Sequence, residues 1–170
     1  MYEIGDYVVS ANEGVCQVKE VVEMRMPGGR EGKKCYAIEP AQSVTGRGTR
    51  LYIPVESDQH QVRPVMTKKE ANALIKRIGK IEETTIEVEK QREQIYKEAI
   101  FSCDPERLVS ILKTLHRRSE QRAAEGKKNT TVDERYYRLA EKNLHSELAF
   151  ALQKDMDKIR EMIMKQVEDI

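Results

Sequence analysis

Residues 2–18 read YEIGDYVVSANEGVCQV, and this stretch predicts the fold of the N-terminal part of the chain. The apolar run at residues 7–9 follows a Gly-Asp pair and precedes the sequence Asn-Glu-Gly, a pattern typical of a β-strand that ends in a turn. Residues 15–18 then begin a second strand. The stretch therefore predicts a β-hairpin from which a small sheet is built.

The second strand is predicted to continue to residue 26, because its polarity alternates with a period of two. Its even positions are apolar side chains or cysteine, at Cys16, Val18, Val22, Met24 and Met26. Residues 20–21 reverse the alternation, as a β-bulge or a strong twist does. We therefore expect a half-buried strand with an irregularity at residues 20–21.

Two further strands are predicted at residues 35–38 and 51–53, and glycines punctuate the loop before each of them. Pro54 closes the last of these strands, because proline cannot donate a hydrogen bond to a sheet. This series of short strands within about 60 residues predicts a small barrel of the SH3 or Tudor-like type.

The chain after Pro64 is predicted to be helical. Capping boxes at residues 67–70 and 131–134 indicate two helix starts, because a threonine oxygen and a glutamate side chain can satisfy each other's backbone amides. The pair Asp104-Pro105 indicates a third start, and Asp155 a fourth. Apolar stripes at helical spacing follow these starts and are typical of a bundle core.

The charged residues 82–98 are also predicted to be helical, and the polar residues 124–129 are predicted to be a break between two helices. The predicted fold class is α+β. A small SH3- or Tudor-like β-barrel at residues 1–65 is followed by an all-α helical bundle domain at residues 66–170.

Charged residues make up 35% of the chain, apolar residues 39%, and the net charge is +1, which gives no global argument for nucleic acid or a membrane surface. No apolar run approaches the roughly 18 residues of a membrane span. The first residues lack the basic-then-apolar pattern of a secretory signal. The three cysteines are odd in number and lack metal-ligand spacing, so we expect buried, reduced thiols in a cytoplasmic protein.

Catalytic and phosphate-binding motifs are absent from the sequence. Gly28-Gly29 lacks the neighbouring residues of a phosphate-binding loop, and the three histidines have no metal-ligand spacing. The carboxylates are interspersed with lysine and arginine, which is typical of solvated helix faces. We therefore expect no enzymatic activity, no metal, no cofactor and no small-molecule substrate.

Several segments resemble the CarD/CdnL family of bacterial transcription regulators, whose barrel is related to that of the transcription-repair coupling factor. In chain order they are GDYVV at 5–9, GVCQV at 14–18, YIPV at 52–55, VRPV at 62–65, YK at 96–97, LHRR at 115–118 and SELAFAL at 146–152. The resemblance covers nearly the whole chain. Two departures occur in the first hairpin, where Ser10-Ala11 replaces a Tyr-Pro pair and Cys16 replaces a glycine.

In that family the N-terminal barrel binds the β subunit of RNA polymerase, and the resemblance implies the same partner here. An edge strand can bind a partner strand through its unpaired amides and carbonyls, while flanking side chains provide specificity. Arg25 is on the polar face of its strand, and Arg50 shares a strand face with Tyr52 because alternate residues point the same way. These three residues, with Arg47 at the adjoining turn, are the predicted polymerase-binding residues.

The helices of that family contact promoter DNA beside the upstream edge of the melted region and stabilise the open complex. The family has a tryptophan, four residues before the tyrosine that corresponds to Tyr96, which wedges at the edge of the DNA bubble. Here that position is Arg92, and the chain contains no tryptophan. An aromatic ring stacked on a base contributes roughly 1–3 kcal/mol. The resemblance therefore implies a modulator of open-complex stability whose DNA wedging is weakened.

Basic residues instead concentrate in residues 107–128, which hold seven basic and two acidic side chains, whereas residues 82–98 hold three basic and six acidic ones. Contacts of the basic segment with backbone phosphates would be independent of base sequence and sensitive to salt. The predicted DNA-contacting residues are Arg92, Tyr96, Lys97, Arg117, Arg118, Arg122, Lys127, Lys128 and Arg135.

An alternative function is that of an adaptor on RNA polymerase, whose helical half binds another protein and contacts no DNA. The missing tryptophan and the acidic character of residues 82–98 favour this alternative. A small enzyme is a third hypothesis, which no constellation of residues supports.

Overall fold

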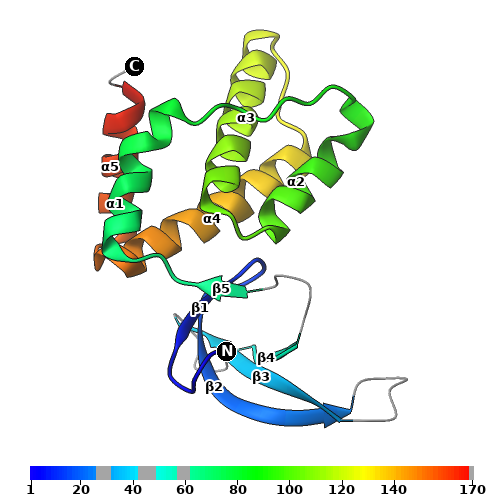
Figure 1. Ribbon diagram of the computed structural model, residues 1–170. Coiled ribbons are helices and arrows are strands. Elements are labelled where there is room, and N and C mark those ends of the chain that lie inside the picture. Colours follow the sequence, from blue (N-terminus) through cyan, green and yellow to red (C-terminus); the bar gives the residue numbers. More distant parts are fainter. Residues whose placement is uncertain (26–31, 42–48, 57–61, 169–170) are drawn as a thin grey trace. The chain divides into compact units, whose positions relative to one another are not determined.

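Figure 1 shows the computed structural model. It describes residues 1–25, 32–41, 49–56 and 62–168. The chain divides into two compact units, Met1–Val65 and Met66–Ile170. The described strands all belong to the first unit and the described helices to the second, which is an α+β arrangement.

The first unit is built on one antiparallel sheet. Its described strands are β1 (Tyr7–Ser10), β2 (Gly14–Arg25), β3 (Gly32–Pro40), β4 (Leu51–Pro54) and β5 (Val62–Pro64). Their order is β4-β3-β2-β1-β5, so β4 and β5 form the edges of the sheet. Gly14 has a φ of +73°, a conformation that glycine adopts without steric cost, where the chain turns from β1 into β2. The hairpin predicted from residues 2–18 is confirmed by the β1–β2 pairing.

The predicted irregularity of β2 is present, slightly nearer the N-terminus than expected. The register against β3 shifts between Val18 and Glu20, which makes Lys19 the extra residue of a β-bulge. Burial changes there: β2 is mostly buried up to Val18 and mostly exposed beyond it. The core of this unit is formed by Val8, Cys16, Val18, Tyr36, Ile38 and Ile53.

The second unit is helical. Its elements are α1 (Lys68–Arg77), the 3-10 turns η1 (Ile78–Lys80) and η2 (Glu89–Gln91), α2 (Arg92–Phe101), α3 (Pro105–Ala124), α4 (Thr131–Leu152) and α5 (Met156–Glu168). The predicted capping box at residues 67–70 is confirmed, with Thr67 accepting from the amide of Glu70 and Glu70 from that of Thr67. The predicted caps at Asp104 and Asp155 are also confirmed, since each carboxylate accepts a backbone amide of the following helix.

The prediction of helix over residues 82–98 is wrong for its first part, because α2 begins only at Arg92. The amide of Thr84 donates to the hydroxyl oxygen of Thr114 at 2.9 Å, and that hydroxyl lies 3.1 Å from the carbonyl of Thr84. These contacts hold the segment to α3, so its backbone is satisfied by a side chain rather than by helical hydrogen bonds.

The predicted capping box at residues 131–134 is displaced by one residue. The N-cap of α4 is Thr130, whose side-chain oxygen accepts from the amide of Asp133 at 3.1 Å. Asp133 thus occupies the position from which a capping-box carboxylate reaches back to the N-cap amide. Its carboxylate instead accepts hydrogen bonds from α2 and α3.

The core of the helical unit includes Ile111, Leu144, Leu148 and Ile159, each at most 2% exposed. The three cysteines are buried and none forms a disulfide bond, as the sequence predicts. Among the helices of the described residues, none is long and apolar enough to cross a membrane. A search over the same part of the chain finds no group of histidine, cysteine and carboxylate side chains that could hold a metal ion.

Candidate functional site

The edge strand β4 presents backbone groups away from its neighbour. The amide of Val55 donates to the carbonyl of Lys34 at 2.9 Å, one step beyond the Cys35–Pro54 pair. Antiparallel pairs alternate between hydrogen-bonded and non-hydrogen-bonded, so the pair of Tyr52 with Ala37 is of the second kind. The amide and the carbonyl of Tyr52 therefore point away from β3, toward the edge of the sheet.

Arg50, directly before β4, is fixed beside this edge by two carboxylates. Its Nη2 lies 2.8 Å from Glu39 Oε1 on β3, and its Nη1 lies 3.4 Å from Glu20 Oε2 on β2. The Arg50 side chain is nevertheless 38% exposed, and Tyr52 is 45% exposed. The predicted pair Arg50 and Tyr52 thus lies together, exposed, at the β4 end of the sheet.

The other two predicted polymerase-binding residues are placed differently. Arg25 is exposed at the far end of β2, where it pairs with Gly32 of β3. It lies five residues along the strand from Glu20, the partner of Arg50, which corresponds to roughly 17 Å. The structure therefore does not bring Arg25 beside Arg50. Arg47 lies outside the described residues.

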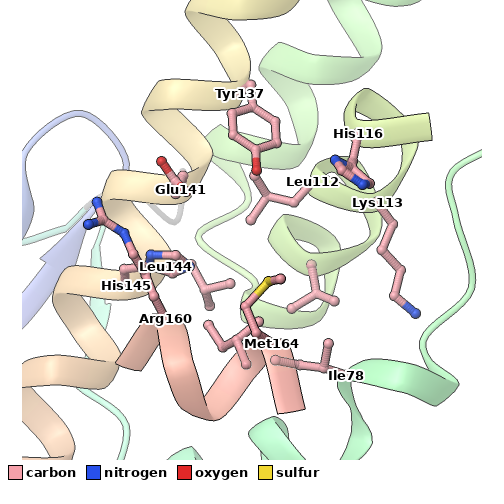
Figure 2. A pocket seen from close by; sticks show the side chains of 12 residues that line it. Ile78, Leu112, Lys113, His116, Tyr137, Glu141, Leu144, His145, Arg160 and Met164 are labelled. Atoms are coloured by element: carbon pink, nitrogen blue, oxygen red, sulfur yellow. The ribbon is translucent and has the colours of Figure 1, made fainter. Parts of the chain in front are cut away.

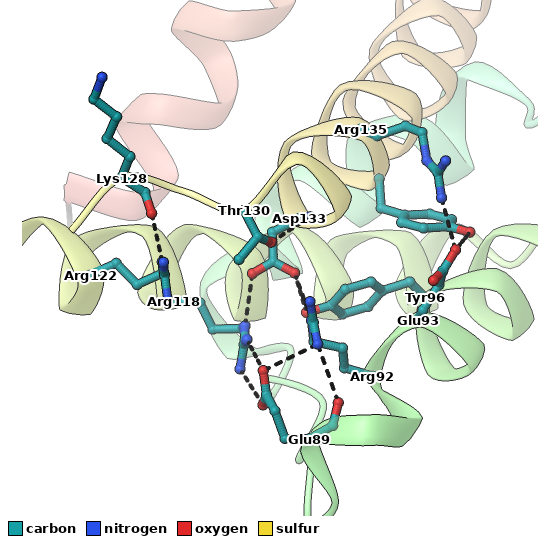
Figure 3. Close-up of polar contacts among 11 residues, drawn as sticks. Glu89, Arg92, Glu93, Tyr96, Arg118, Arg122, Lys128, Thr130, Asp133 and Arg135 are labelled. Atoms are coloured by element: carbon teal, nitrogen blue, oxygen red, sulfur yellow. Dashed lines mark hydrogen bonds and ion pairs between the residues drawn. The ribbon is translucent and has the colours of Figure 1, made fainter.

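In the helical unit, Asp133 is the centre of a polar network shown in Figure 3. Its side chain is only 5% exposed, and its carboxylate accepts three hydrogen bonds. The donors are Arg92 Nε at 3.3 Å, the Tyr96 hydroxyl at 3.2 Å and Arg118 Nε at 3.2 Å. A buried carboxylate needs such partners because it has lost its hydration. Asp133 therefore ties α2 and α3 to the first turn of α4.

Glu89, in η2, is the second carboxylate of this network. Arg118 donates to its two oxygens, from Nη1 at 3.1 Å and from Nη2 at 2.6 Å, in a bidentate pair. Arg92 Nη1 lies 3.5 Å from the same carboxylate. The hydrogen bond from Arg118 lowers the pKa of Glu89 below its ordinary value. The two arginines thus face two carboxylates, and their charges are balanced inside the cluster.

The structure contradicts the predicted role of one DNA-contacting residue, Tyr96. Its side chain has no exposed surface, and burial together with the charge of Asp133 raises the pKa of its hydroxyl. The prediction that Tyr96 contacts DNA is therefore wrong, because a fully buried ring cannot reach a phosphate or a base. Its ring instead packs against that of Tyr136, with 5.5 Å between the ring centroids.

Three further predicted residues on this unit are exposed but paired. Lys97 Nζ lies 3.7 Å and Arg135 Nη2 lies 2.8 Å from the same oxygen of Glu93. On α3, Arg117 Nε lies 2.7 Å from Glu83 Oε2. Ion pairs this exposed are weak, so a competing phosphate could exchange with these carboxylates.

The turn between α3 and α4 keeps its basic groups more accessible. Arg122 Nε donates to the carbonyl of Lys128 at 2.8 Å, an acceptor that carries no charge. Lys127 pairs with Glu125 at 2.7 Å, but both side chains are more than half exposed. The Lys128 side chain is exposed. The structure thus brings Arg122, Lys127 and Lys128 together at one exposed turn.

The residues that the sequence prediction missed are carboxylates that orient the predicted cations. They are Glu20, Glu39, Glu83, Glu89, Glu93 and Asp133. Most lie on a different element from the arginine they bind, so no local spacing indicates them. The one local signal is the position of Asp133 at the third residue after an N-cap threonine.

Comparison with protein-family models identifies the first unit of the chain. Residues 2–66 match the family model of the CarD-like/TRCF RID domain, a Tudor-like domain that interacts with RNA polymerase. No curated protein matches the chain. The matched residues coincide with the unit that carries the β4 edge, and the predicted α+β class is confirmed. The β unit of this chain therefore belongs to the CarD-like/TRCF RID family of RNA polymerase-interacting domains.

Proposed function

We propose that this protein is an accessory factor of RNA polymerase that docks on the β subunit through β4 and modulates the stability of promoter open complexes through its helical unit. The observation that carries the proposal is the family match over the unit with the open β4 edge. Binding of the purified chain to core RNA polymerase tests it. Failure to bind the core enzyme at micromolar concentrations would overturn it.

The proposed docking mode is addition of a polymerase strand to β4. The outward amide and carbonyl of Tyr52 form one donor–acceptor pair for that strand, and Pro54 limits the edge because it has no amide hydrogen. Arg50 provides specificity from the sheet face next to this edge, because Glu39 of β3 and Glu20 of β2 order its guanidinium before a partner arrives. Preorganised side chains lose less entropy on binding, which favours affinity.

The proposed DNA contact lies at the α3–α4 turn. Lys127 and Lys128 offer exposed positive charge there, with the partly buried Arg122 of α3 beside them, and contacts from such groups reach phosphates rather than base edges. Arg92, at the position of the family tryptophan, has its guanidinium bound to Asp133 and Glu89. It supplies no aromatic face for stacking, so the expected stabilisation of the open complex is weak.

Replacing Lys127 and Lys128 with alanine is expected to weaken binding of a short DNA duplex by the full chain. Because each phosphate contact contributes about 0.9 to the slope of log K against log salt concentration, the slope should fall by about 2. A fluorescence anisotropy titration across a salt series measures this. The matched control replaces two other exposed lysines with alanine, Lys142 within α4 and Lys154 just after its end. Equal slopes for both double variants would contradict a contact at the turn.

Replacing Glu89 with glutamine is expected to strengthen binding of the same duplex about threefold, because Arg118 would lose its bidentate carboxylate and could meet a phosphate. The matched control is Glu120→Gln on α3, which removes the same charge from an exposed residue that pairs with His116. If both variants bind DNA equally, net charge rather than release of Arg118 explains the effect, and the prediction is wrong.

A second candidate function is an adaptor that binds polymerase through β4 and contacts no DNA. The observation that favours it is the neutralisation of Arg92 and Arg118 by Glu89 and Asp133, together with the burial of Tyr96. The two functions differ in one measurement. An adaptor that binds core polymerase would show no salt-dependent affinity for duplex DNA.

A further inference from the structure

A cavity of about 290 Å³ lies in the helical unit, away from the polar network around Asp133. Its walls come from η1, α3, α4 and α5, and apolar side chains dominate them, including Leu112, Leu144, Ile163 and Met164. Figure 2 shows Leu112, Leu144 and Met164 around a common space. The volume is at the lower end of the range typical of small-molecule pockets.

Most of the accessible lining of the cavity is apolar, although the residues around it include Lys113, His116, Tyr137, Glu141, His145 and Arg160. The Tyr137 hydroxyl points into it (Figure 2), and the ring of His145 lines it. His145 is 6% exposed, and its Nδ1 has no hydrogen-bond partner in the described part of the chain. This nitrogen also has almost no solvent-accessible surface, so a molecule in the cavity cannot bond to it, and the Tyr137 hydroxyl is the polar group aimed into the space.

The charged side chains at the cavity wall are Lys113, Glu141 and Arg160. The ammonium of Lys113 donates to the carbonyls of Gly79 and Ile81, at 3.1 and 2.7 Å, so only its aliphatic stem faces the space. Glu141 and Arg160 act in opposite directions on the pKa of Tyr137. Burial lowers the pKa of His145, which favours the neutral imidazole. Because charges of both signs line the space, a charged ligand would lie near a like charge as well as an opposite one, on a surface that is mainly apolar.

We infer that this cavity binds a small, uncharged, mainly apolar molecule that carries one hydroxyl group. The apolar walls from α3, α4 and α5 enclose its body. The Tyr137 hydroxyl is the group that faces its polar end. A hydroxyl suits this contact because both hydroxyl groups can donate or accept a hydrogen bond. The inference is independent of the polymerase partner proposed above.

The test is titration of the full chain with 1-naphthol, followed by the methyl NMR signals of Leu144 and Ile163 and by calorimetry. We expect saturable binding of one molecule per chain, with a Kd on the order of 100 µM for a ligand of this size. Its charged counterpart, 1-naphthoate, should bind at least about tenfold more weakly. Absence of saturable shifts at millimolar naphthol, or equal affinity for both probes, would overturn the inference.

Two variants locate the bound probe. Leu112→Trp fills the cavity and should abolish naphthol binding, whereas Phe101→Trp adds the same ring at an exposed position of α2 outside the cavity and should leave it unchanged. Tyr137→Phe removes one neutral hydrogen bond and should weaken binding about fivefold. This small change serves as the test if Leu112→Trp does not fold, and full affinity in Tyr137→Phe would contradict the assigned polar contact.

Another occupant of the cavity would give a different result. If a second copy of the chain filled it, the wild-type chain would self-associate in sedimentation experiments and Leu112→Trp would be monomeric. That outcome would overturn a small-molecule site.

Discussion

Replacing Arg50 with glutamate is expected to lower the affinity of the chain for core RNA polymerase at least about tenfold, which corresponds to about 1.4 kcal/mol. Arg50 is exposed beside the open edge of β4, where its guanidinium is oriented by Glu20 and Glu39. The substitution removes the oriented guanidinium and places a third carboxylate beside Glu20 and Glu39, so the hydrogen-bond donors at this site are lost. Surface plasmon resonance with immobilised core enzyme measures the change.

The matched control for this prediction is Arg63→Glu. Arg63 belongs to β5, the opposite edge strand of the same sheet, so the substitution makes the same charge change in the same domain. We expect it to have a small effect on affinity. A third variant, Arg50→Gln, removes the positive charge without adding a third carboxylate. It tests whether a loss of affinity in Arg50→Glu comes from unfolding of the domain. Equal affinities for the Arg50 and Arg63 variants would exclude β4 as the docking edge.

Replacing Asp133 with alanine is expected to lower the free energy of unfolding of the helical unit by about 3 kcal/mol, the lower end of the range for breaking a buried ion pair. The lower end applies because Arg92 and Arg118 are still 23% and 20% exposed, so water can solvate them in part. The substitution also leaves the buried hydroxyl of Tyr96 without its acceptor. Urea denaturation followed by circular dichroism measures the change.

Asp157→Ala provides the control for Asp133. Asp157 also lies in the first turn of its helix and also pairs with an arginine, Arg160, at 3.2 Å, but its side chain is 90% exposed. Exposed pairs contribute little, so we expect no measurable loss of stability. A loss for Asp133→Ala no larger than that for Asp157→Ala would show that the network does not hold the helices together.

Local rules account for most of the secondary structure. The hairpin at residues 2–18, the cap at Thr67 and the Asp104 cap depend on neighbours within a few residues, so sequence spacing predicts them. The prediction of a helix over residues 82–98 is wrong for its first part because that part is held by a contact with a residue far away in the sequence. Thr84 is 30 residues from Thr114, and the contact between them forms only when the segment lies against α3.

Some features of the candidate site could likewise be predicted from sequence spacing, and others could not. The pairing of Arg50 with Tyr52 on one strand face follows from the period of two and could be predicted. The partners of the basic residues could not, because Asp133 is separated from Arg92 by 41 residues and from Arg118 by 15. Burial likewise changes the role of Tyr96, from a predicted DNA contact to the fully enclosed donor of a core hydrogen bond.

The sequence by itself determined the α+β class, the first hairpin and the identity of the polymerase-interacting domain, because these depend on short motifs in a set order. Tertiary structure alone decided which charges remain available. An arginine counts the same in any sequence tally, but its field is screened in full only when a carboxylate lies within a few ångströms. Packing of η2, α2, α3 and α4 brings Glu89 and Asp133 to that distance from Arg92 and Arg118, and leaves the α3–α4 turn exposed.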